Sequence, residues 1–279
     1  MTDVASARTL LFVPADRSDR VAKALASPAD LVVVDLEDAV AAAGKAVARD
    51  VAVSVAADPR VVVRVNAAGT PWHDTDLRAL ARVAHTLMLP KAEDAAAVVA
   101  LGRSTGAAVV ALVETARGVL HAAEIAAADP VVRLAFGSMD LAAQLGVDPR
   151  DDVALAPHRA TLVLASAAEG LPPPVDGVFA DLSDEEGLRA ETEAGRRLGY
   201  RAKLCVHPRQ LDVVRRALAP TPDEVAWARE VVAVATDGVS ALAGHMIDAP
   251  VVARAAALLR AVDGGPAPDA PKESHARPR

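Results

Sequence analysis

Short runs rich in valine, leucine and other strand-forming residues alternate with alanine-rich segments along most of this chain. Eight runs have the character of strands: residues 9–14, 31–37, 61–66, 86–91, 108–114, 132–138, 175–182 and 202–207. Segments with apolar residues at helical spacing lie between the first six: 18–27, 44–56, 74–84, 93–103 and 116–127. Strands that alternate with helices pair in parallel through crossover connections. Eight such strands predict an α/β fold of the (β/α)8 TIM-barrel type.

A doubly wound open sheet is the main alternative fold for this pattern. Such a sheet usually carries a glycine-rich phosphate-binding turn after its first strand. Here the turn reads VPADRSDR, residues 13–20, and contains no glycine. The barrel is therefore the favoured fold.

Further elements are predicted after the eighth strand: helices at 209–218, 222–235 and 251–262, and a loop at 238–250. We expect a TIM-barrel domain at residues 1–235 and a C-terminal helical extension at 236–263. The segment 264–279 is polar and rich in proline, which is typical of a disordered tail.

Composition narrows the classes of function. The formal net charge of −7 and the aromatic content of 2% argue against a nucleic-acid-binding surface. Cys205 is the only cysteine, so an internal disulfide is impossible and we expect a core thiol. The sequence has neither a leader pattern nor an apolar run close to the roughly 20 residues of a membrane span. We therefore expect a soluble cytoplasmic protein that binds neither nucleic acid nor membranes.

Polar residues follow the predicted strands at their carboxyl ends. They are Asp35, Glu37, Asp38, Arg64, Asn66, Lys91, Glu114, Asp140 and His207. In a TIM barrel the catalytic groups gather at this end of the strands. Surface decoration would scatter charges over both ends of the barrel, so the pattern favours a functional site.

Glu114 and Asp140 follow consecutive strands, which lie about 5 Å apart in a parallel sheet. Two carboxylates this close repel each other unless a proton or a cation lies between them. Oxygen ligands of this kind suit Mg²⁺, which takes one or two carboxylates together with water and substrate oxygens. The alternative is structural: Glu114 would pair with Arg117, and Asp140 would cap the following helix.

Arg64 ends a valine-rich strand, so its guanidinium is expected to point toward the same site. A planar fork of donors matches a substrate carboxylate. An internal ion pair with Asp35 or Glu37 is the alternative, and the two roles are compatible. The backbone N–H groups near Gly137 and Ser138 could bind a carboxylate or an oxyanion at a helix start, although this pattern is weak by itself.

Two histidine-containing segments are expected to be structural. His207 precedes a proline in CVHPRQ and could serve as an acid or a base, but a hydrogen-bonded structural histidine is favoured. Trp72 and His73 lie in a predicted rim loop, where a single tryptophan more often packs than recognises a ligand.

Eight motifs occur in an order that resembles one known family: TLLFVPADR, LVVVDLEDAV, VVVRVN, LMLPKAE, LVETARG, LAFGSMDLAAQLG, LCVHPRQ and GHMIDAPV. They resemble the CitE-like proteins, the citrate lyase β-subunit branch of the HpcH/HpaI aldolase family. The similarity covers about residues 8–260. Each motif is short, but eight in register make the resemblance specific at the level of the family.

The resemblance implies a TIM barrel, a homotrimer, and Mg²⁺-dependent cleavage or formation of carbon–carbon bonds on acyl thioesters, with Mn²⁺ as a possible substitute. By motif, Glu114 and Asp140 resemble the metal-binding carboxylates, and Arg64 resembles the arginine that contacts the oxo-acid part of the substrate. Asp248 resembles an acid/base aspartate that reaches the site of a neighbouring subunit.

The other site residues follow from the same motifs. Gly137, Ser138 and Met139 of the GSMD motif are expected to bind substrate. The acidic residues Asp35, Glu37 and Asp38 are expected to surround the metal site, where they hold metal-bound water and orient Arg64.

These features predict a lyase, or a synthase in reverse, acting on a malyl-CoA- or citramalyl-CoA-type thioester to give acetyl-CoA and a 2-oxo acid. A citrate lyase β subunit working with an acyl carrier protein, and a pyruvate aldolase without CoA, are the alternatives. One departure bears on the carrier: many relatives have FVPG where this chain has FVPADR. Arg17 and Arg20 could compensate by binding phosphate.

Overall fold

The computed structural model describes residues 3–235, 240–242 and 245–262. The contacts divide the chain into two compact units, Met1–Leu218 and Ala219–Arg279.

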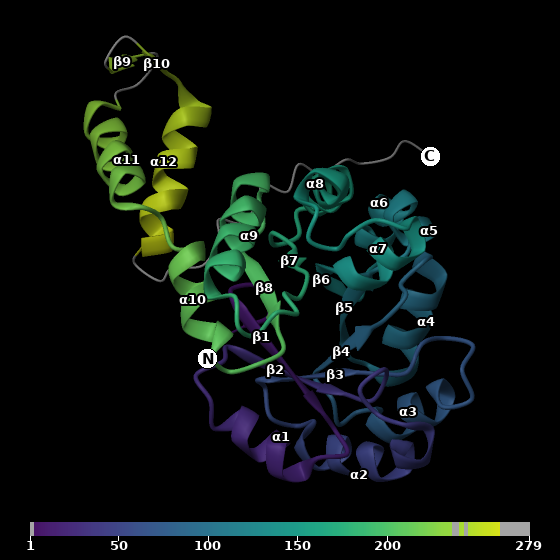
Figure 1. Ribbon diagram of the computed structural model, residues 1–279. Helices are drawn as coiled ribbons and strands as arrows, with labels where there is room; N and C mark the ends of the chain where they lie inside the picture. The colour runs from purple at the N-terminus through teal and green to yellow at the C-terminus, as the bar shows by residue number, and fades with distance from the viewer. Residues whose placement is uncertain (1–2, 236–239, 243–244, 263–279) are drawn as a thin grey trace, which may run out of the picture. The chain divides into compact units, whose positions relative to one another are not determined.

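Within the described residues, eight parallel strands of the first unit close into a barrel (Figure 1). They are β1 (Thr9–Pro14), β2 (Leu31–Asp35), β3 (Val61–Arg64), β4 (Thr86–Leu89), β5 (Ala108–Val113), β6 (Val131–Phe136), β7 (Val175–Asp176) and β8 (Ala202–Cys205). The ring closes where β1 pairs with β8, with Thr9 opposite Lys203. The predicted TIM barrel is confirmed.

Helices surround the barrel on its outside (Figure 1). They are α1 (Ser18–Leu25), α2 (Lys45–Val55), α3 (His73–Leu80), α4 (Ala95–Thr105), α5 (Ala116–Leu120), α6 (Ala122–Ala126), α7 (Ser138–Leu145), α8 (Asp152–Ala168), α9 (Glu185–Leu198) and α10 (Gln210–Leu218), with the short 3-10 turn η1 (Ala42–Gly44) before α2. The prediction of a single helix at 116–127 was wrong, because two short helices, α5 and α6, occupy this segment. His121 interrupts it with a non-helical backbone, and its ring Nδ1 lies 2.7 Å from the carbonyl oxygen of Glu93.

In most strands, alternate residues belong to two separate hydrophobic clusters. On β2, Val33 belongs to the cluster inside the barrel, whereas Val32 and Val34 pack with residues of the surrounding helices. Strands buried on both faces carry continuous apolar runs, which explains the valine repeats of the sequence. The small side chains of the helices, such as Ala48 on α2, allow close packing against the strands.

Strand β7 is much shorter than the segment 175–182 predicted for it, because the chain leaves the ladder after Asp176. The next residue, Gly177, passes so close to Ser138 that an added Cβ would overlap the serine side chain. This close crossing ends the strand and brings the chain over the carboxyl end of β6.

A buried cluster of charges links β7 to its neighbours. Asp176 accepts hydrogen bonds from Arg159 of α8 at 2.9 Å and from Lys203 of β8 at 3.2 Å. Lys203 also donates to Glu191 of α9 at 2.7 Å. These four side chains, which we call the β7 charge cluster, are all buried. They join two helices and two strands where the backbone ladder is short.

The second unit contains two helices and a strand pair within its described residues. These elements are α11 (Pro222–Val234), β9 (Ser240–Leu242), β10 (His245–Ile247) and α12 (Ala249–Val262). A capping box of Thr221 and Glu224 starts α11, and Arg254 of α12 stacks 4.7 Å from the ring centre of Trp227. The predicted loop at 238–250 therefore contains strands β9 and β10, which pair with each other in antiparallel fashion.

The unit boundary precedes α11, whereas the sequence placed the end of the barrel domain after residue 235. Helix α11 groups with α12 because the two pack along each other. The predicted tail at 264–279 lies outside the described residues, as do residues 236–239, 243–244 and 263 of the predicted extension. In the described part of the chain, no helix is both long and apolar enough to cross a membrane.

Candidate active site

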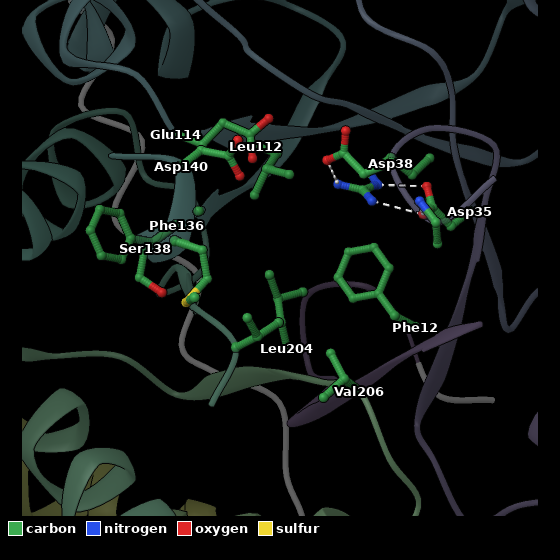
Figure 2. Close-up of a pocket in the computed structure, with 15 residues that line it drawn as sticks. Phe12, Asp35, Asp38, Leu112, Glu114, Phe136, Ser138, Asp140, Leu204 and Val206 are labelled. Atoms are coloured by element: carbon green, nitrogen blue, oxygen red, sulfur yellow. Dashed lines mark hydrogen bonds and ion pairs between the residues drawn. The ribbon is translucent and has the colours of Figure 1, made fainter. Parts of the chain in front are cut away.

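A pocket of about 360 Å³ opens at the carboxyl ends of the barrel strands (Figure 2). Its lining residues are Phe12, Asp35, Asp38, Ala39, Arg64, Leu112, Glu114, Phe136, Gly137, Ser138, Met139, Asp140, Val178, Leu204 and Val206. Phe12, Leu204 and Val206 lie together in one part of the pocket, whereas Leu112 and Phe136 lie near Glu114 and Asp140 (Figure 2). Five of the nine predicted strand-end residues line this pocket: Asp35, Asp38, Arg64, Glu114 and Asp140. Glu37, Asn66, Lys91 and His207 are not among its lining residues.

Glu114 and Asp140 lie side by side in this pocket (Figure 2). Glu114 is buried, and its Oε1 accepts the backbone N–H of Lys91 at 2.8 Å. Burial, and then the charges of Glu37 and Asp140, raise the pKa of Glu114 to about 8. A cation between the two carboxylates would relieve this repulsion.

The glycine between β6 and α7 is needed for this arrangement. A Cβ at Gly137 would overlap the side chain of Glu114. The structural alternatives for the acidic pair are wrong: Arg117 lies near Glu93, at 3.9 Å, and α7 begins at Ser138, so Asp140 is inside the first turn. Neither carboxylate is therefore occupied by the structural role that was its alternative.

Arg64 is held by three acidic residues on the other side of the pocket. Its Nε and Nη2 each donate to Asp35 at 2.7 Å, which gives a paired hydrogen bond. Its Nη1 lies 3.0 Å from Glu37 and 3.5 Å from Asp38. The guanidinium also stacks 4.9 Å from the ring centre of Phe12. Burial lowers the pKa of Arg64, but the hydrogen bonds to Asp35 and the charges of Asp35, Glu37 and Asp38 raise it above its ordinary value.

The turn that carries these acids is itself fixed. Asp35 accepts the backbone N–H groups of Glu37 at 2.9 Å and Ala39 at 3.1 Å. From behind, the buried Lys45 donates to the carbonyl oxygens of Leu36 at 2.6 Å and Glu37 at 2.7 Å. The position of the acidic residues is therefore set by backbone hydrogen bonds as well as by Arg64.

The rim loop after β3 has a structural role. Asn66 accepts a hydrogen bond from Lys45 at 2.7 Å and donates to Asp76 at 2.6 Å. Trp72 covers the Lys45 ammonium at 5.0 Å, and His73 Nδ1 lies 2.7 Å from the Asn66 carbonyl oxygen. Trp72 packs against Lys45, in agreement with the packing role predicted for it.

Other predicted residues lie away from the pocket lining. His207 Nδ1 accepts the backbone N–H of Arg209 at 3.1 Å, as expected for a structural histidine. Burial raises the pKa of the Cys205 thiol to about 12, in agreement with a core thiol. Arg17 is exposed and pairs with Asp19 at 3.3 Å.

Asp248 belongs to the second unit, where it precedes α12. Its Oδ1 accepts the backbone N–H of Val251 at 3.2 Å, so it caps the helix. The barrel pocket, as far as the described residues form it, is lined without Asp248.

The acidic pair suits a hard divalent cation. Among the described residues, no group of three or more His, Cys, Asp or Glu side chains is placed to hold a metal ion. Glu114 and Asp140 supply two carboxylates, which is the number that Mg²⁺ commonly accepts while keeping its other positions for water and substrate. The donor set therefore fits Mg²⁺ better than a metal that requires a closed cage of side chains.

Sequence reasoning missed the supporting lysine. Lys45 stands in an alanine-rich segment, and a lysine on the apolar side of a predicted helix is a signal that could have identified a buried ammonium. Phe12, which stacks on Arg64, has no sequence signal beyond its place in the first strand.

Known proteins are similar to this chain in sequence and in fold. Residues 8–208 match the family model described as HpcH/HpaI aldolase/citrate lyase. A citrate lyase subunit beta-like protein of Mycobacterium tuberculosis is 46% identical over 260 residues, which cover 90% of this chain and 93% of that protein. A (3S)-malyl-CoA thioesterase of Cereibacter sphaeroides is 37% identical, with 81% of this chain and 82% of that protein covered.

A crystal structure of a known protein is also similar to this chain. The protein CitE of Mycobacterium tuberculosis, in complex with magnesium, acetoacetate and coenzyme A, superimposes with a TM-score of 0.83 at 44% sequence identity. The match covers 93% of this chain and 99% of that chain.

Proposed function

This chain belongs to the HpcH/HpaI aldolase/citrate lyase family, and on that basis we propose that it is a carbon–carbon lyase acting on 3-hydroxyacyl-CoA thioesters. The substrate would be of the malyl-CoA or citramalyl-CoA type. Cleavage would give acetyl-CoA and a 2-oxo acid, glyoxylate or pyruvate, and the reverse reaction would be a Claisen-type synthesis.

The observation that carries this proposal is one pocket that holds an acidic pair and an arginine at separate places in its lining. Glu114 and Asp140 form an acidic pair on one side, and Arg64 is fixed by Asp35 on the other. A 2-oxo or 2-hydroxy acid has the complementary groups, a carboxylate next to a second oxygen. The relative that binds magnesium, acetoacetate and coenzyme A supports the same reading.

Glu114 and Asp140 would hold Mg²⁺, or Mn²⁺ in its place, which supplies Lewis-acid stabilisation of negative charge on substrate oxygens. Arg64 would bind the carboxylate of the 2-oxo acid. Of the five guanidinium N–H donors, two go to Asp35 and the two on Nη1 face Glu37 and Asp38, so the second N–H of Nη2 remains for the substrate. The N–H groups near Ser138 and Met139, at the start of α7, would fix the same carboxylate.

Asp248 would act as the acid/base group, contributed by a neighbouring subunit of a homotrimer. In cleavage, the substrate hydroxyl would lose its proton to the Asp248 carboxylate, and its C–O bond would become C=O as the bond to the carbon next to the thioester breaks and leaves its electron pair on that carbon. That carbon then takes a proton from Asp248. In the synthetic direction, Asp248 would remove the proton.

The Asp248→Asn variant tests this role, because asparagine keeps the helix cap that Asp248 provides. We expect turnover to be lost while the thermal unfolding midpoint and metal affinity stay at their original values. Substantial residual turnover would contradict the role. Mixing this variant with Glu114→Gln subunits should restore part of the activity if each site uses residues of two subunits.

The direct test of the function is release of acetyl-CoA from malyl-CoA and citramalyl-CoA by purified protein, with and without Mg²⁺. Metal-dependent release of acetyl-CoA together with glyoxylate or pyruvate would support the lyase. Release from neither ester, in the presence of bound metal, would contradict it.

The relatives also suggest two other reactions. The similarity to a (3S)-malyl-CoA thioesterase favours hydrolysis as the second candidate. Hydrolysis yields malate and free CoA in place of glyoxylate and acetyl-CoA, so the same assay separates the two. The similarity to a citrate lyase subunit beta-like protein would instead predict activity on a citryl thioester of an acyl carrier protein, and only with partner subunits.

A further inference from the structure

Lys91 contacts two acidic residues around the pocket, Glu114 through its backbone N–H and Glu37 through its side chain. Its backbone N–H donates to Oε1 of Glu114 at 2.8 Å. Its side-chain Nζ donates to Oε1 of Glu37 at 2.7 Å and lies 3.9 Å from Oε1 of Glu114. One residue thus bridges two carboxylates that would otherwise repel each other.

The backbone of Lys91 has an unusual conformation. Its φ is +49°, and in the part of the chain that the structure describes only Arg82 among the other non-glycine residues has a positive φ. L-residues with a full side chain seldom adopt this region, and such outliers occur preferentially at functional sites. Here the conformation accompanies the hydrogen bond from the N–H of Lys91 to Glu114.

Glu37 lies near Glu114, because the Lys91 ammonium is 2.7 Å from one Glu37 oxygen and 3.9 Å from one Glu114 oxygen. Glu37 is buried, and its negative charge is one of the causes that raise the pKa of Glu114. In the structure, however, one oxygen of Glu37 bonds to Lys91 and the other lies 3.0 Å from Nη1 of Arg64. Accordingly, no three acidic side chains of the described residues are placed together as metal ligands.

We propose that Lys91 is a positioning residue that holds Glu37 away from the metal and thereby selects Mg²⁺ over Ca²⁺. This inference rests on the proposed function, because it assigns the metal to Glu114 and Asp140. Mg²⁺ takes one or two carboxylates in compact octahedral geometry and keeps several waters. Ca²⁺ takes six to eight oxygens in flexible geometry, so a third carboxylate favours Ca²⁺ much more than Mg²⁺.

If Lys91 acted through its charge alone, its removal would affect metal binding differently from the entry of Glu37 into the coordination sphere. The removal of a positive charge near a divalent ion strengthens binding of Mg²⁺ and Ca²⁺ by the same electrostatic factor. The ratio of the two affinities would then stay constant. A change in the ratio is therefore the signature of Glu37 entering the coordination sphere.

The experiment measures dissociation constants of Mg²⁺ and Ca²⁺ by competition against Mn²⁺, with free Mn²⁺ followed by electron paramagnetic resonance. In Lys91→Met we expect Ca²⁺ binding to strengthen about tenfold or more, and Mg²⁺ binding to strengthen by less than half of that factor. Lys91→Arg, which keeps the charge and the reach toward Glu37, should retain the original ratio. Lys23→Met, at an exposed lysine of α1, controls for the change in net charge.

Several outcomes would overturn the inference. They are equal strengthening of both ions, no change, or weaker binding in Lys91→Met. Thermal unfolding of each variant shows whether it is folded under the assay conditions.

Failure of the proposed function has a separate signature. If the unsubstituted protein binds no Mn²⁺, the metal site and the role of Lys91 are both contradicted. If it binds Mn²⁺, and Glu114→Gln abolishes binding, an unchanged ratio in Lys91→Met contradicts only the role of Lys91.

Discussion

Arg64 donates its Nε and Nη2 hydrogen bonds to Asp35, each at 2.7 Å, so its guanidinium has one orientation in the pocket. Lysine at this position keeps the charge but cannot form the paired bonds. We therefore expect Arg64→Lys to lower kcat/KM about 10- to 100-fold, the effect of losing hydrogen bonds to a charged group. Steady-state kinetics on the thioester would measure this. Full activity at an unchanged unfolding midpoint would show that orientation is unimportant.

Glu114 predicts a pH dependence of stability in the metal-free protein. Its pKa is about 8 in the folded state, against an ordinary value of 4.5. Between these values the folded protein keeps a proton that the unfolded chain has released. The free energy of unfolding therefore falls as pH rises from about 4.5 to about 8, by about 2–4 kcal/mol from this residue.

Urea unfolding at several pH values would test this prediction. Glu114→Gln should show a flatter pH profile, since glutamine does not titrate. Saturating Mg²⁺ should also flatten the profile, because the metal binds the charged carboxylate of the folded state. Identical slopes for the original protein and Glu114→Gln would contradict the assignment of the raised pKa.

At the level of single residues, the charged residues of the site were predictable from sequence, but the hydrogen bonds and ion pairs between them were not. Glu114, Asp140 and Arg64 were predictable because each follows a strand and carries charge. The φ of +49° at Lys91 was not, because nothing in the letters LPK requires a left-handed backbone. The same holds for Lys45, whose three acceptors come from parts of the chain that only the fold brings together.

The turn between β6 and α7 carries the next prediction. A side chain at Gly137 would overlap Glu114, so Gly137→Ala must displace the carboxylate. We expect metal binding to be lost and stability to fall by about 1–3 kcal/mol. Gly102→Ala is a matched control, since its Cβ would overlap the side chain of Pro130, and neither residue lines the pocket. Isothermal titration with Mn²⁺ should show binding in the control and none in Gly137→Ala.

Among elements, the first six strands were predicted within a few residues, because buried parallel strands read as continuous valine and leucine runs. Strand β7 was overpredicted, since the run after Asp176 is equally apolar in sequence but crosses Ser138 at Gly177. Helices α8 and α9 were not predicted from the sequence. The acidic and basic residues of α9, including the buried Glu191, obscure its apolar face.

At the scale of the whole molecule, the β7 charge cluster makes a measurable contribution to stability. Lys203 is fully buried between Asp176 and Glu191. We expect Lys203→Met to lower the free energy of unfolding by about 3–5 kcal/mol, because it leaves buried carboxylates without their partner. Arg189→Met is the control: Arg189 pairs with Glu186 and Glu193 on the surface, where loss of a pair costs at most about 1 kcal/mol.

Urea denaturation followed by circular dichroism would compare the two variants. An equal decrease in the free energy of unfolding of both variants would mean that burial of the β7 charge cluster does not affect its contribution to stability. The comparison uses one lysine and one arginine from ion pairs of the same barrel unit, so the main difference between them is exposure.

The short strand β7 also bears on how copies of the protein behave toward one another. A closed ring of strands offers no free edge to another chain. The register of β7 consists of Val175 opposite Ala135 on one side, and of Val175 and Asp176 opposite β8 on the other. If β7 detached, β6 and β8 would become two unpaired edges, able to recruit strands from other molecules. The buried charges that tether β7 therefore protect the barrel from aggregation as well as from unfolding.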